Sequence, residues 1–368
     1  MPDVLSTKAL NRATLARQML LAREATPALD AISRLAGMQA QVPKPPFLGL
    51  WSRLSGFRRE ELLDLVHRRE VVRGTAMRAT LHLMTAADYL ALRPALQPML
   101  SAAMTSVLRQ RAEALDLTAL IETAKHFFEE EPRTFTELRA HLMERFPDGD
   151  ERAMGYAART QLPLVMVPDD SPWGFPADSD FTTAETWLGK PLDGSEKLAE
   201  LVKRYLAAFG PATVTDAQTW SGLKGLKGTF EAMRGELVTF RDARKRELFD
   251  LPDAPRPAED TPAPVRFLPE YDNLVLAHAD RSRVIAEAYR PRIVTANLKV
   301  LATFLVDGTV AGTWKIAKKG KVATLVVEPF EPLSESIREE IAEEGLQALR
   351  FSEEDARTFD LKIEPPQA

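Results

Sequence analysis

The side chains that most often carry catalysis follow no familiar pattern in this sequence. A His-Glu-x-x-His helix would bind zinc and a Gly-Lys-Ser/Thr loop would cradle phosphate, but neither pattern is present. Histidines are scattered at positions 67, 82, 126, 141 and 278. Cysteine is absent, which excludes disulfides, thiolate metal sites and cysteine nucleophiles. No metal or cofactor is therefore predicted, and these local patterns name no reaction.

Composition and length predict a folded protein of several domains. The 368 residues are enough for two to four domains, and hydrophobic and charged fractions of 45% and 27% are ordinary for globular proteins. Charged residues interrupt the first 21 positions, so no signal peptide is predicted. No apolar run approaches the roughly 18 residues of a membrane span. We expect a cytoplasmic protein without a membrane partner.

The net charge of −5 conceals two basic segments. Residues 1–112 hold sixteen Lys/Arg and eight Asp/Glu, and residues 281–321 hold nine and two. Residues 328–364 hold four Lys/Arg and twelve Asp/Glu, which offsets this positive charge in the total. Since nucleic-acid binding depends on where charge is concentrated, the acidic total does not exclude it.

A repeat becomes visible when the middle of the sequence is aligned with itself. Residues 134–138 and 213–217 share a β-favouring triplet that ends in Thr and is followed by an acid. Thr136 and Thr215 are predicted to cap helices, and the acid after each suits the positive helix end. In both copies a helix precedes this start, and a second helical segment and two strands follow it. Such a series is typical of a winged helix.

Extending this plan to the N-terminal region predicts three tandem winged-helix units. The first unit, 1–112, would contain helices at 14–23, 28–38, 46–54 and 59–68 and a wing hairpin formed by 71–78 and 80–84. The second, 113–192, would contain a helix at 117–130 and strands at 164–167 and 173–175. The third, 193–252, would contain a helix at 196–209 and strands at 236–241 and 247–251.

A proline-rich linker and a β-rich domain are predicted after these units. Five prolines fall between residues 251 and 266, which predicts a semi-rigid linker at 253–265. The rest, 266–368, would contain strands at 273–277, 302–306, 310–316 and 322–327 and an acidic helix at 333–349. The predicted fold class is therefore α+β.

Several blocks of sequence resemble one enzyme family. They are Leu35–Pro43, Leu50–Leu54, Val72–Gly74, Met77–Leu83, Phe267–Asn273, His278–Arg281 and Phe304–Gly308. These blocks resemble the winged-helix DNA glycosylases of the AlkZ/YcaQ type, over a stretch from Leu10 to about Phe330. The resemblance implies three tandem winged helices and a C-terminal β-barrel-like domain that curve around double-stranded DNA. It also implies unhooking of interstrand crosslinks, including those formed by azinomycin B.

The catalytic motif of that family is Gln-x-Gln in one branch and Gln-x-Asp in the other. The resemblance therefore implies that Gln39 and Gln41 are catalytic. Residues i and i+2 lie about 200° apart on a helix but on one side of extended backbone. Because Pro43 disfavours helical backbone at Val42, we expect the helix to end near Met38 or Gln39. The two glutamines could then face one pocket.

Two neutral amides limit the chemistry that such a motif can perform. A guanine alkylated at N7 already carries positive charge and leaves as a neutral base, so no acid is required. The amide carbonyls can position water and stabilise the sugar cation. The motif thus predicts a monofunctional glycosylase for cationic lesions, without a Schiff-base step.

Basic residues in three places are candidates for DNA contact. His278, Arg281 and Arg283 belong to or follow one family block, and Arg244 and Lys245 lie at the tip of the third wing. Lys315, Lys318, Lys319 and Lys321 decorate a hairpin that the resemblance implicates in engaging the lesion.

Two other functions are compatible with the same winged helices. A non-catalytic winged-helix regulator would need the basic segments but not the glutamine pair. Such a regulator usually carries a dimerisation helix, and the sequence contains no long heptad segment that would form one. A protein that shields lesions without cleaving them would differ only in turnover. We expect a monomer that binds double-stranded DNA containing alkylated or crosslinked guanine, in general repair or in self-resistance to a toxin.

Overall fold

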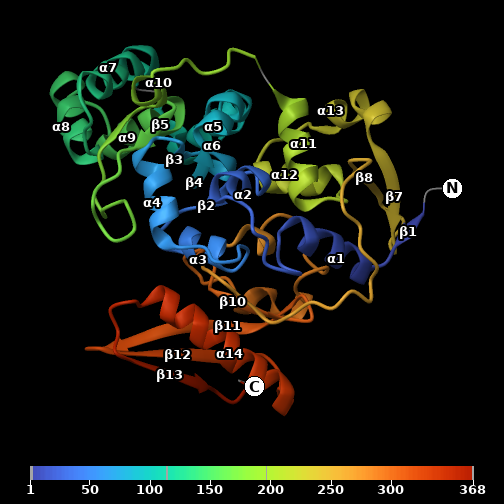
Figure 1. Ribbon diagram of the computed structural model, residues 1–368. Helices are drawn as coiled ribbons and strands as arrows, with labels where there is room; N and C mark the ends of the chain where they lie inside the picture. The colour runs from blue at the N-terminus through green and yellow to red at the C-terminus, as the bar shows by residue number, and fades with distance from the viewer. Residues whose placement is uncertain (1–2, 113–114, 196, 367–368) are drawn as a thin grey trace.

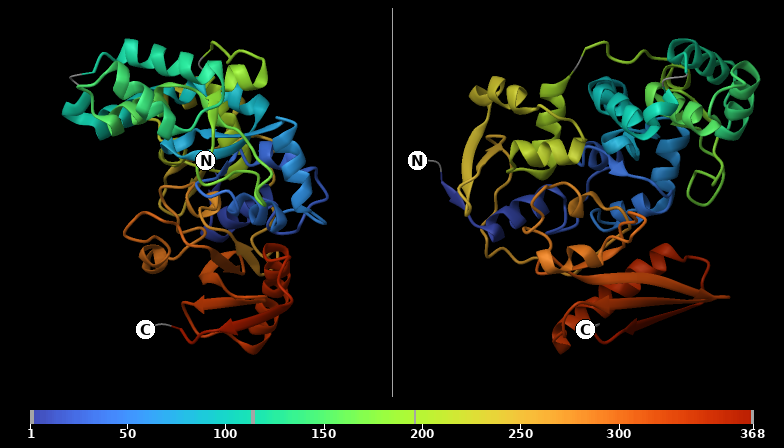
Figure 2. Two further views of the ribbon diagram at one scale, coloured as in Figure 1. Left: turned by 90° about the vertical axis from the view of Figure 1, so that its left-hand side faces the viewer. Right: turned by 180° about the vertical axis from the view of Figure 1, so that it is seen from behind.

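The computed structural model describes residues 3–112, 115–195 and 197–366 of a mixed α+β protein. The predicted second and third units lie on opposite sides of the first, and the C-terminal sheet and helix lie beneath it (Figure 1). The views from the side and from behind show the same arrangement (Figure 2). The first unit is therefore the part that every other part contacts.

The first unit holds its four predicted helices, although their ends differ. They are α1 (Thr7–Arg17), α2 (Ala28–Arg34), α3 (Pro45–Trp51) and α4 (Arg59–His67), followed by β3 (Val71–Thr75), η1 (Met77–Ala79), β4 (Leu81–Thr85), α5 (Ala86–Leu92), η2 (Pro94–Leu96), α6 (Gln97–Leu108) and η3 (Arg109–Ala112). The prediction of a first helix at 14–23 was wrong by several residues. Ser6 caps α1 by accepting from the Ala9 N–H, and Met19, at φ 55°, lies beyond its end.

The second unit contains α7 (Leu117–Glu130), α8 (Phe135–Arg145), α9 (Glu151–Gln161), β5 (Leu164–Met166), β6 (Phe181–Thr183) and α10 (Ala184–Leu188). The N-cap of α8 is Thr134, so the prediction that Thr136 caps this helix was wrong. Thr134 Oγ1 accepts from the Glu137 N–H at 3.1 Å, and the Glu137 carboxylate accepts from the Thr134 N–H at 2.8 Å. In this reciprocal pair the acid must lie three positions after the Thr, a spacing that Thr134 has to Glu137 and Thr136 does not.

The prediction of a strand at 173–175 was also wrong. Residues 169–174 close on themselves instead, since the Asp169 N–H donates to Gly174 O and the Gly174 N–H donates to Ser171 O. The partner of β5 is β6, with Val165 opposite Thr182. A long loop therefore replaces the tight hairpin of the second wing.

The strands of the first two units form one sheet. Its order is β2-β4-β3-β5-β6, where β2 is Met38–Gln39, and Gly74 of β3 is paired with Val165 of β5. A Cβ at Gly74 would lie 2.8 Å from Leu164 O, so a side chain there would separate the two strands. The two predicted units are thus joined through backbone hydrogen bonds.

The predicted third unit contains α11 (Leu198–Phe209), α12 (Val214–Ser221), α13 (Lys227–Ala232), η4 (Arg234–Glu236), β7 (Val238–Asp242) and β8 (Glu247–Asp250). The predicted positions of its two strands are confirmed. The N-cap of α12 is Thr213, which forms a capping box with Asp216, so the prediction of Thr215 was wrong. β1 (Val4–Leu5) adds to β7 in parallel, so the N-terminus completes a three-stranded sheet.

The C-terminal part is an open sheet, and the prediction of a barrel-like domain was wrong. Its elements are β9 (Arg266–Leu268), η5 (Asn273–Val275), η6 (Glu287–Arg292), β10 (Thr303–Val306), β11 (Thr309–Lys319), β12 (Val322–Pro329), α14 (Glu335–Ser352) and β13 (Thr358–Ile363). The strand order is β13-β12-β11-β10-β9, and within the described residues neither edge strand pairs with the other. Residues 273–277, predicted as a strand, begin with η5.

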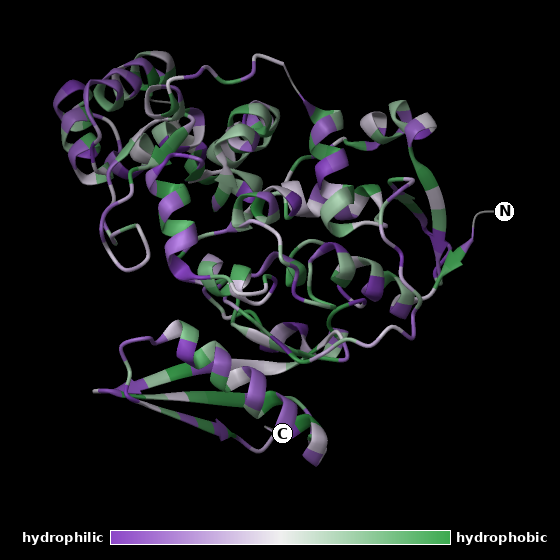
Figure 3. Cartoon of the chain, viewed as in Figure 1, coloured by the Kyte–Doolittle hydropathy of each residue, from purple (hydrophilic) through white to green (hydrophobic). Residues whose placement is uncertain are grey.

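Each hydrophobic core combines residues from more than one predicted unit. One core joins Leu50 of α3 to Phe128 of α7, and another joins Leu15 of α1 to Leu305 of β10. The helix α14 shows hydrophilic and hydrophobic bands along its length (Figure 3) and turns residues such as Ile341 and Leu349 to the sheet. Since apolar burial stabilises a fold roughly in proportion to area, the units stabilise one another.

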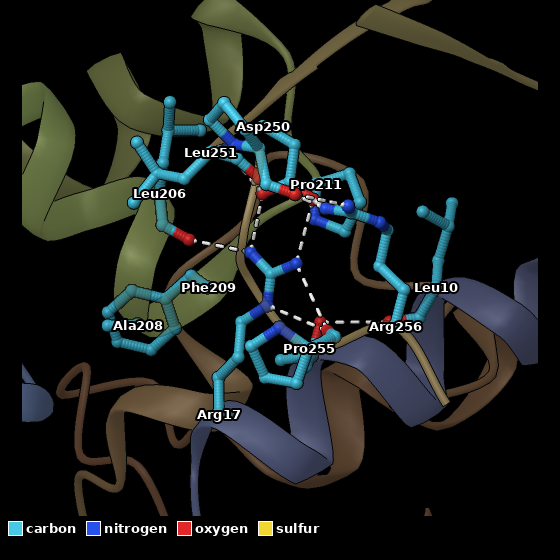
Figure 4. Close-up of polar contacts among 12 residues, drawn as sticks. Leu10, Arg17, Leu206, Ala208, Phe209, Pro211, Asp250, Leu251, Pro255 and Arg256 are labelled. Carbon is cyan, nitrogen blue, oxygen red and sulfur yellow. Dashed lines mark hydrogen bonds and ion pairs between the residues drawn. The ribbon is translucent and has the colours of Figure 1, made fainter. Parts of the chain in front are cut away.

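A buried ion pair joins α1 to the third unit (Figure 4). Arg17 donates to both carboxylate oxygens of Asp250 at 2.7 and 2.8 Å and to Leu206 O at 2.8 Å. The side chains of Arg17 and Asp250 are 1% and 0% exposed. Arg256, from the predicted linker, also binds Asp250, so that segment is held against α1.

Asp250→Ala is expected to lower the free energy of unfolding by about 3–5 kcal/mol, because it leaves the buried Arg17 guanidinium without its carboxylate. Urea denaturation followed by circular dichroism would measure the change. Asp355→Ala is the control, since the Asp355 carboxylate is 61% exposed and its ion pairs should contribute less than about 1 kcal/mol. Equal effects of the two substitutions would contradict a structural role for the buried pair.

Candidate active site

The Gln39–Gln41 segment starts where α2 is broken. Ala36 and Gly37 have φ values of 54° and 89°, and the Gly37 N–H donates to Ile32 O at 3.1 Å. A Cβ at Gly37 would lie 2.8 Å from Met84 Cγ. The chain then becomes β2, in which Gln39 is paired with His82. The glutamines therefore lie on extended backbone as predicted, but the helix ends earlier than expected, and Gly37 rather than Pro43 accounts for its end.

Gln39 is held by an arginine at the tip of the first wing. Its side chain is almost buried, at 9% exposure, and its Oε1 accepts from Arg78 Nη2 at 2.8 Å. Arg78 also donates to Trp220 O at the end of α12. The Gln39 amide is thus oriented by a residue that connects the first wing to the third unit.

Gln41 is exposed, and its amide is bound to the same wing. Its Oε1 accepts from the Leu81 N–H at 3.0 Å. Arg73 donates to the backbone carbonyls of Ala40 at 2.9 Å and Gln41 at 3.2 Å. Both catalytic candidates therefore reach the β3–β4 hairpin, Gln39 at its connecting loop and Gln41 at the start of β4, and both amide oxygens already accept one hydrogen bond.

The two side chains nevertheless line different hollows, contrary to the prediction of one pocket. Gln39 lines a crevice of about 10 Å³, together with Pro45, Pro269 and Tyr271. Gln41 lines a cleft of about 460 Å³ between the first two units. Only the larger space could admit a nucleobase, since about 10 Å³ is roughly the room of one water.

The Phe267–Asn273 block of the C-terminal part contacts the backbone just before the glutamine segment. Asn273 Nδ2 donates to Gly37 O at 2.9 Å, two residues before Gln39. Asp272 accepts from Arg53 at 2.8 and 2.9 Å in a pair whose side chains are each 2% exposed. These contacts link the Phe267–Asn273 block to the catalytic candidates, which explains why the two patterns occur in one chain.

Sequence reasoning did not single out Arg78 as a functional residue. Arg78 and Ala79 have φ values of 55° and 56°, a conformation that residues with side chains rarely adopt. Burial, together with the charge of Arg281, lowers the pKa of Arg78 to about 10, so the guanidinium stays charged at neutral pH. An arginine at a hairpin tip is ordinarily exposed, so nothing local to the sequence indicated that Arg78 is half-buried and bonded to Gln39.

Two predicted DNA-binding residues are buried, and those predictions were wrong. His278 is 1% exposed and its Nε2 lies 3.0 Å from Phe209 O. Arg283 is 6% exposed and donates to Pro211 O at 2.9 Å and to Thr14 Oγ1 at 3.2 Å. Both side chains connect α1, the third unit and the C-terminal part, so neither is available to a phosphate.

The other basic candidates lie at or near the surface. Arg281 is half-buried, and Arg244 pairs with Asp280 at 3.2 Å while Lys245 occupies the turn beside it. Lys315 pairs with Glu328, and Lys318 and Lys321 pair with Asp355 at the tip of the β11–β12 hairpin. Lys319 is exposed at the end of β11. Contact of these residues with DNA stays a prediction.

Comparison with known proteins identifies the family. The sequence model described as "DNA glycosylase AlkZ-like" matches residues 32–351. The chain belongs to the AlkZ-like DNA glycosylase family. A curated relative from Streptomyces sahachiroi, "Interstrand DNA cross-link repair glycosylase", is 28% identical over 336 residues, which are 85% of this chain and 88% of the relative.

The fold is also that of a solved relative. The structure of Streptomyces sahachiroi DNA glycosylase AlkZ is similar, with a TM-score of 0.79 at 22% identity, over 98% of this chain and 100% of that one. The family model and the curated relative confirm the resemblance and identify the protein as a DNA glycosylase. Within the ranges that the structure describes, none of the helices has the length and apolar character that crossing a membrane requires.

The two buried histidines, His82 and His278, are expected to make the stability of the fold depend on pH. Burial lowers the pKa of His82 from the ordinary 6.5 to about 3, and burial likewise lowers the pKa of His278. Between pH 3 and 6.5 the unfolded chain thus binds more protons at these sites. Their contribution to stability is present above pH 6.5 and decreases as the pH falls below it.

His82→Gln is therefore expected to flatten the decline in unfolding free energy between pH 7 and pH 4.5. Urea denaturation at several pH values would measure the slope for the wild type and the variant. His126→Gln is the control, because His126 is 78% exposed and should leave the slope unchanged. A wild-type slope retained by His82→Gln would contradict a neutral buried histidine.

Proposed function

We propose that this glycosylase hydrolyses the N-glycosidic bond of cationic N7-alkylguanines in double-stranded DNA, with Gln39 and Gln41 as catalytic residues. The observation that carries the proposal is the tethering of both amides to the β3–β4 hairpin, by Arg78 and by the Leu81 N–H. The name of the Streptomyces sahachiroi relative extends the proposal to guanines joined in an interstrand crosslink. Cytoplasmic location and a monomeric state stay predictions.

The chemistry follows from what the two amides can supply. When N7-alkylguanine departs, positive charge moves from the base to the sugar. A carbonyl oxygen has two lone pairs, so each glutamine oxygen can accept its hydrogen bond from the protein and still face the sugar cation or the attacking water. An amide is a poor base, so the proton of the water passes to another acceptor. Glu270 lines the same crevice as Gln39, and its carboxylate, which pairs with Lys299 at 2.8 Å, is the acceptor that we assign to this step.

Arg78 is the positioning residue in this mechanism. A charged donor on Gln39 Oε1 fixes which way the amide points, and the contact to Trp220 O fixes the guanidinium in turn. Because the donor is positively charged, it holds the oxygen, rather than the NH₂ group, of Gln39 toward the wing loop. The cleft beside Gln41 is open on the solvent side, which suits leaving groups of different size.

Base release should follow the charge of the lesion and require both glutamines. Wild-type protein is expected to release N7-methylguanine and bulkier N7-alkylguanines but not uracil or 1,N6-ethenoadenine, because no group protonates a neutral base. Gln39→Ala and Gln41→Ala should each slow release by about 100-fold or more with DNA affinity nearly unchanged. Single-turnover assays on matched oligonucleotides would measure this, with Gln161→Ala, outside the site, as the control. Rapid release of uracil by the wild type would refute the neutral-amide mechanism.

Arg78→Met should slow base release about tenfold to 100-fold, since a hydrogen bond to a charged group contributes ~1.5–3 kcal/mol. The decisive measurement is a double-mutant cycle. Once Gln39 is replaced by Ala, the further change Arg78→Met should have little added effect on the rate, because its target is gone. If Arg78→Met slowed base release by the same factor with and without Gln39→Ala, and also lowered the unfolding temperature, Arg78 would act only on stability.

A further inference from the structure

A cleft rich in arginine separates the first two units next to Gln41. It has a volume of about 460 Å³, and its lining includes Gln41 together with four arginines, Arg73, Arg139, Arg152 and Arg159. Among the described residues that line this cleft, Asp178 is the one acid. The arginines come from β3, α8 and α9, so the cleft exists only because the two units share a sheet.

Arg73 lies at the inner wall of this cleft with part of its donor capacity unused. Its side chain is 3% exposed, and its Nε and Nη2 hold the carbonyls of Ala40 and Gln41. Its Nη1 is buried without a hydrogen-bond partner among the described residues. An unpaired buried guanidinium nitrogen is costly, so a ligand that accepts its hydrogen bond would be stabilised there.

The neighbouring arginines add positive charge that the protein leaves largely uncompensated. Arg159 is half-buried near the ring of Phe135, at 5.9 Å, and its charge acts with burial to lower the pKa of Arg73 to about 10. Neither Arg159 nor the exposed Arg152 forms an ion pair or hydrogen bond with any residue in the ranges described. Arg139 differs, because it pairs with Glu151 at 3.2 Å.

We propose that this cleft binds phosphodiester groups of the DNA strand that carries the damaged guanine, with Arg152 and Arg159 as the phosphate ligands. The proposal rests on the proposed function of Gln41, which lines the same cleft. Guanidinium forks match phosphate oxygens, and a phosphate held by Arg152 and Arg159 would offset the repulsion between Arg73 and Arg159. Arg73 would then connect the bound strand to the backbone of Gln41.

A phosphate site here would place the damaged nucleotide at the catalytic amide. Phosphate contacts set the register of a protein on DNA without reading sequence. The lysines of the β11–β12 hairpin are less available for this role, because Lys315, Lys318 and Lys321 already pair with acids. The cleft between the first two units therefore becomes the positioning surface for the lesion strand.

The first test measures the affinity for a duplex with one N7-methylguanine by fluorescence anisotropy at several salt concentrations. Arg152→Ala and Arg159→Ala should each weaken binding about fivefold to tenfold and lower the salt slope by about 0.9, the value for one lost phosphate contact. Arg145→Ala, an exposed arginine of α8 that does not line the cleft, is the matched control and should change affinity less than about twofold. Unfolding temperatures would verify that the variants are folded.

The second test replaces single phosphates around the lesion by neutral methylphosphonates. Wild-type affinity should drop at one or two positions of the lesion strand, and Arg159→Ala should lose its sensitivity at those positions only. Equal sensitivity of the wild type and Arg159→Ala at every position would overturn the proposal, as would an unchanged salt slope in both cleft variants. A drop confined to the undamaged strand would overturn its assignment to the lesion strand.

These measurements separate the cleft from the glycosylase mechanism, because both are binding experiments. Absent base release by the wild type together with the predicted methylphosphonate pattern would refute the proposed function and retain the phosphate site. Normal release of N7-methylguanine together with an unchanged pattern in Arg159→Ala would refute the phosphate site alone.

Discussion

A guanidinium that leaves water must find fixed acceptors, and this constraint joins the parts of the molecule. Arg17 with Asp250, Arg53 with Asp272, and Arg283 with Pro211 O each connect the first unit or the third unit to a distant segment. An unpaired buried charge costs several kcal/mol, so each arginine permits one arrangement of its neighbours and penalises others. The catalytic candidates depend on that arrangement, since Arg78 and Asn273 reach them from the first wing and the C-terminal part.

The same constraint separates arginines that hold the fold from arginines that are available to DNA. Arg17, Arg53 and Arg283 have their donors directed at carboxylates or carbonyls within the protein. Arg152 and Arg159 have no such partners in the described part of the chain and line an open cleft. The arginines of this chain are therefore divided between two tasks, and only the structure shows which arginine has its donors occupied within the protein.

The site combines a rigid support with neutral chemistry. Gln39 is almost buried and bonded to Arg78, while Gln41 is exposed and bonded to backbone, so the pair presents one protected and one accessible amide. Burial keeps His82 neutral over the physiological range, so it supplies no proton to a departing base. Under the proposed mechanism, such a site depends on a leaving group that already carries its positive charge.

The sequence by itself determined those features of the structure that depend on residues close together in the chain. The helix at 117–130, the strands of the third wing and the extended glutamine segment followed from local spacing, and the family followed from short blocks of residues. Local spacing was also misread, since the capping box that starts at Thr134 was assigned to Thr136. The tertiary structure decided which wing strands share a sheet, that the C-terminal sheet stays open, and that His278 and Arg283 are buried. These outcomes depend on partners far apart in the chain, as with Arg17 and Asp250 at a separation of 233 residues. A charged or aromatic side chain has the same local pattern on the surface and in a core, and only the acceptor that folding brings to it decides between the two.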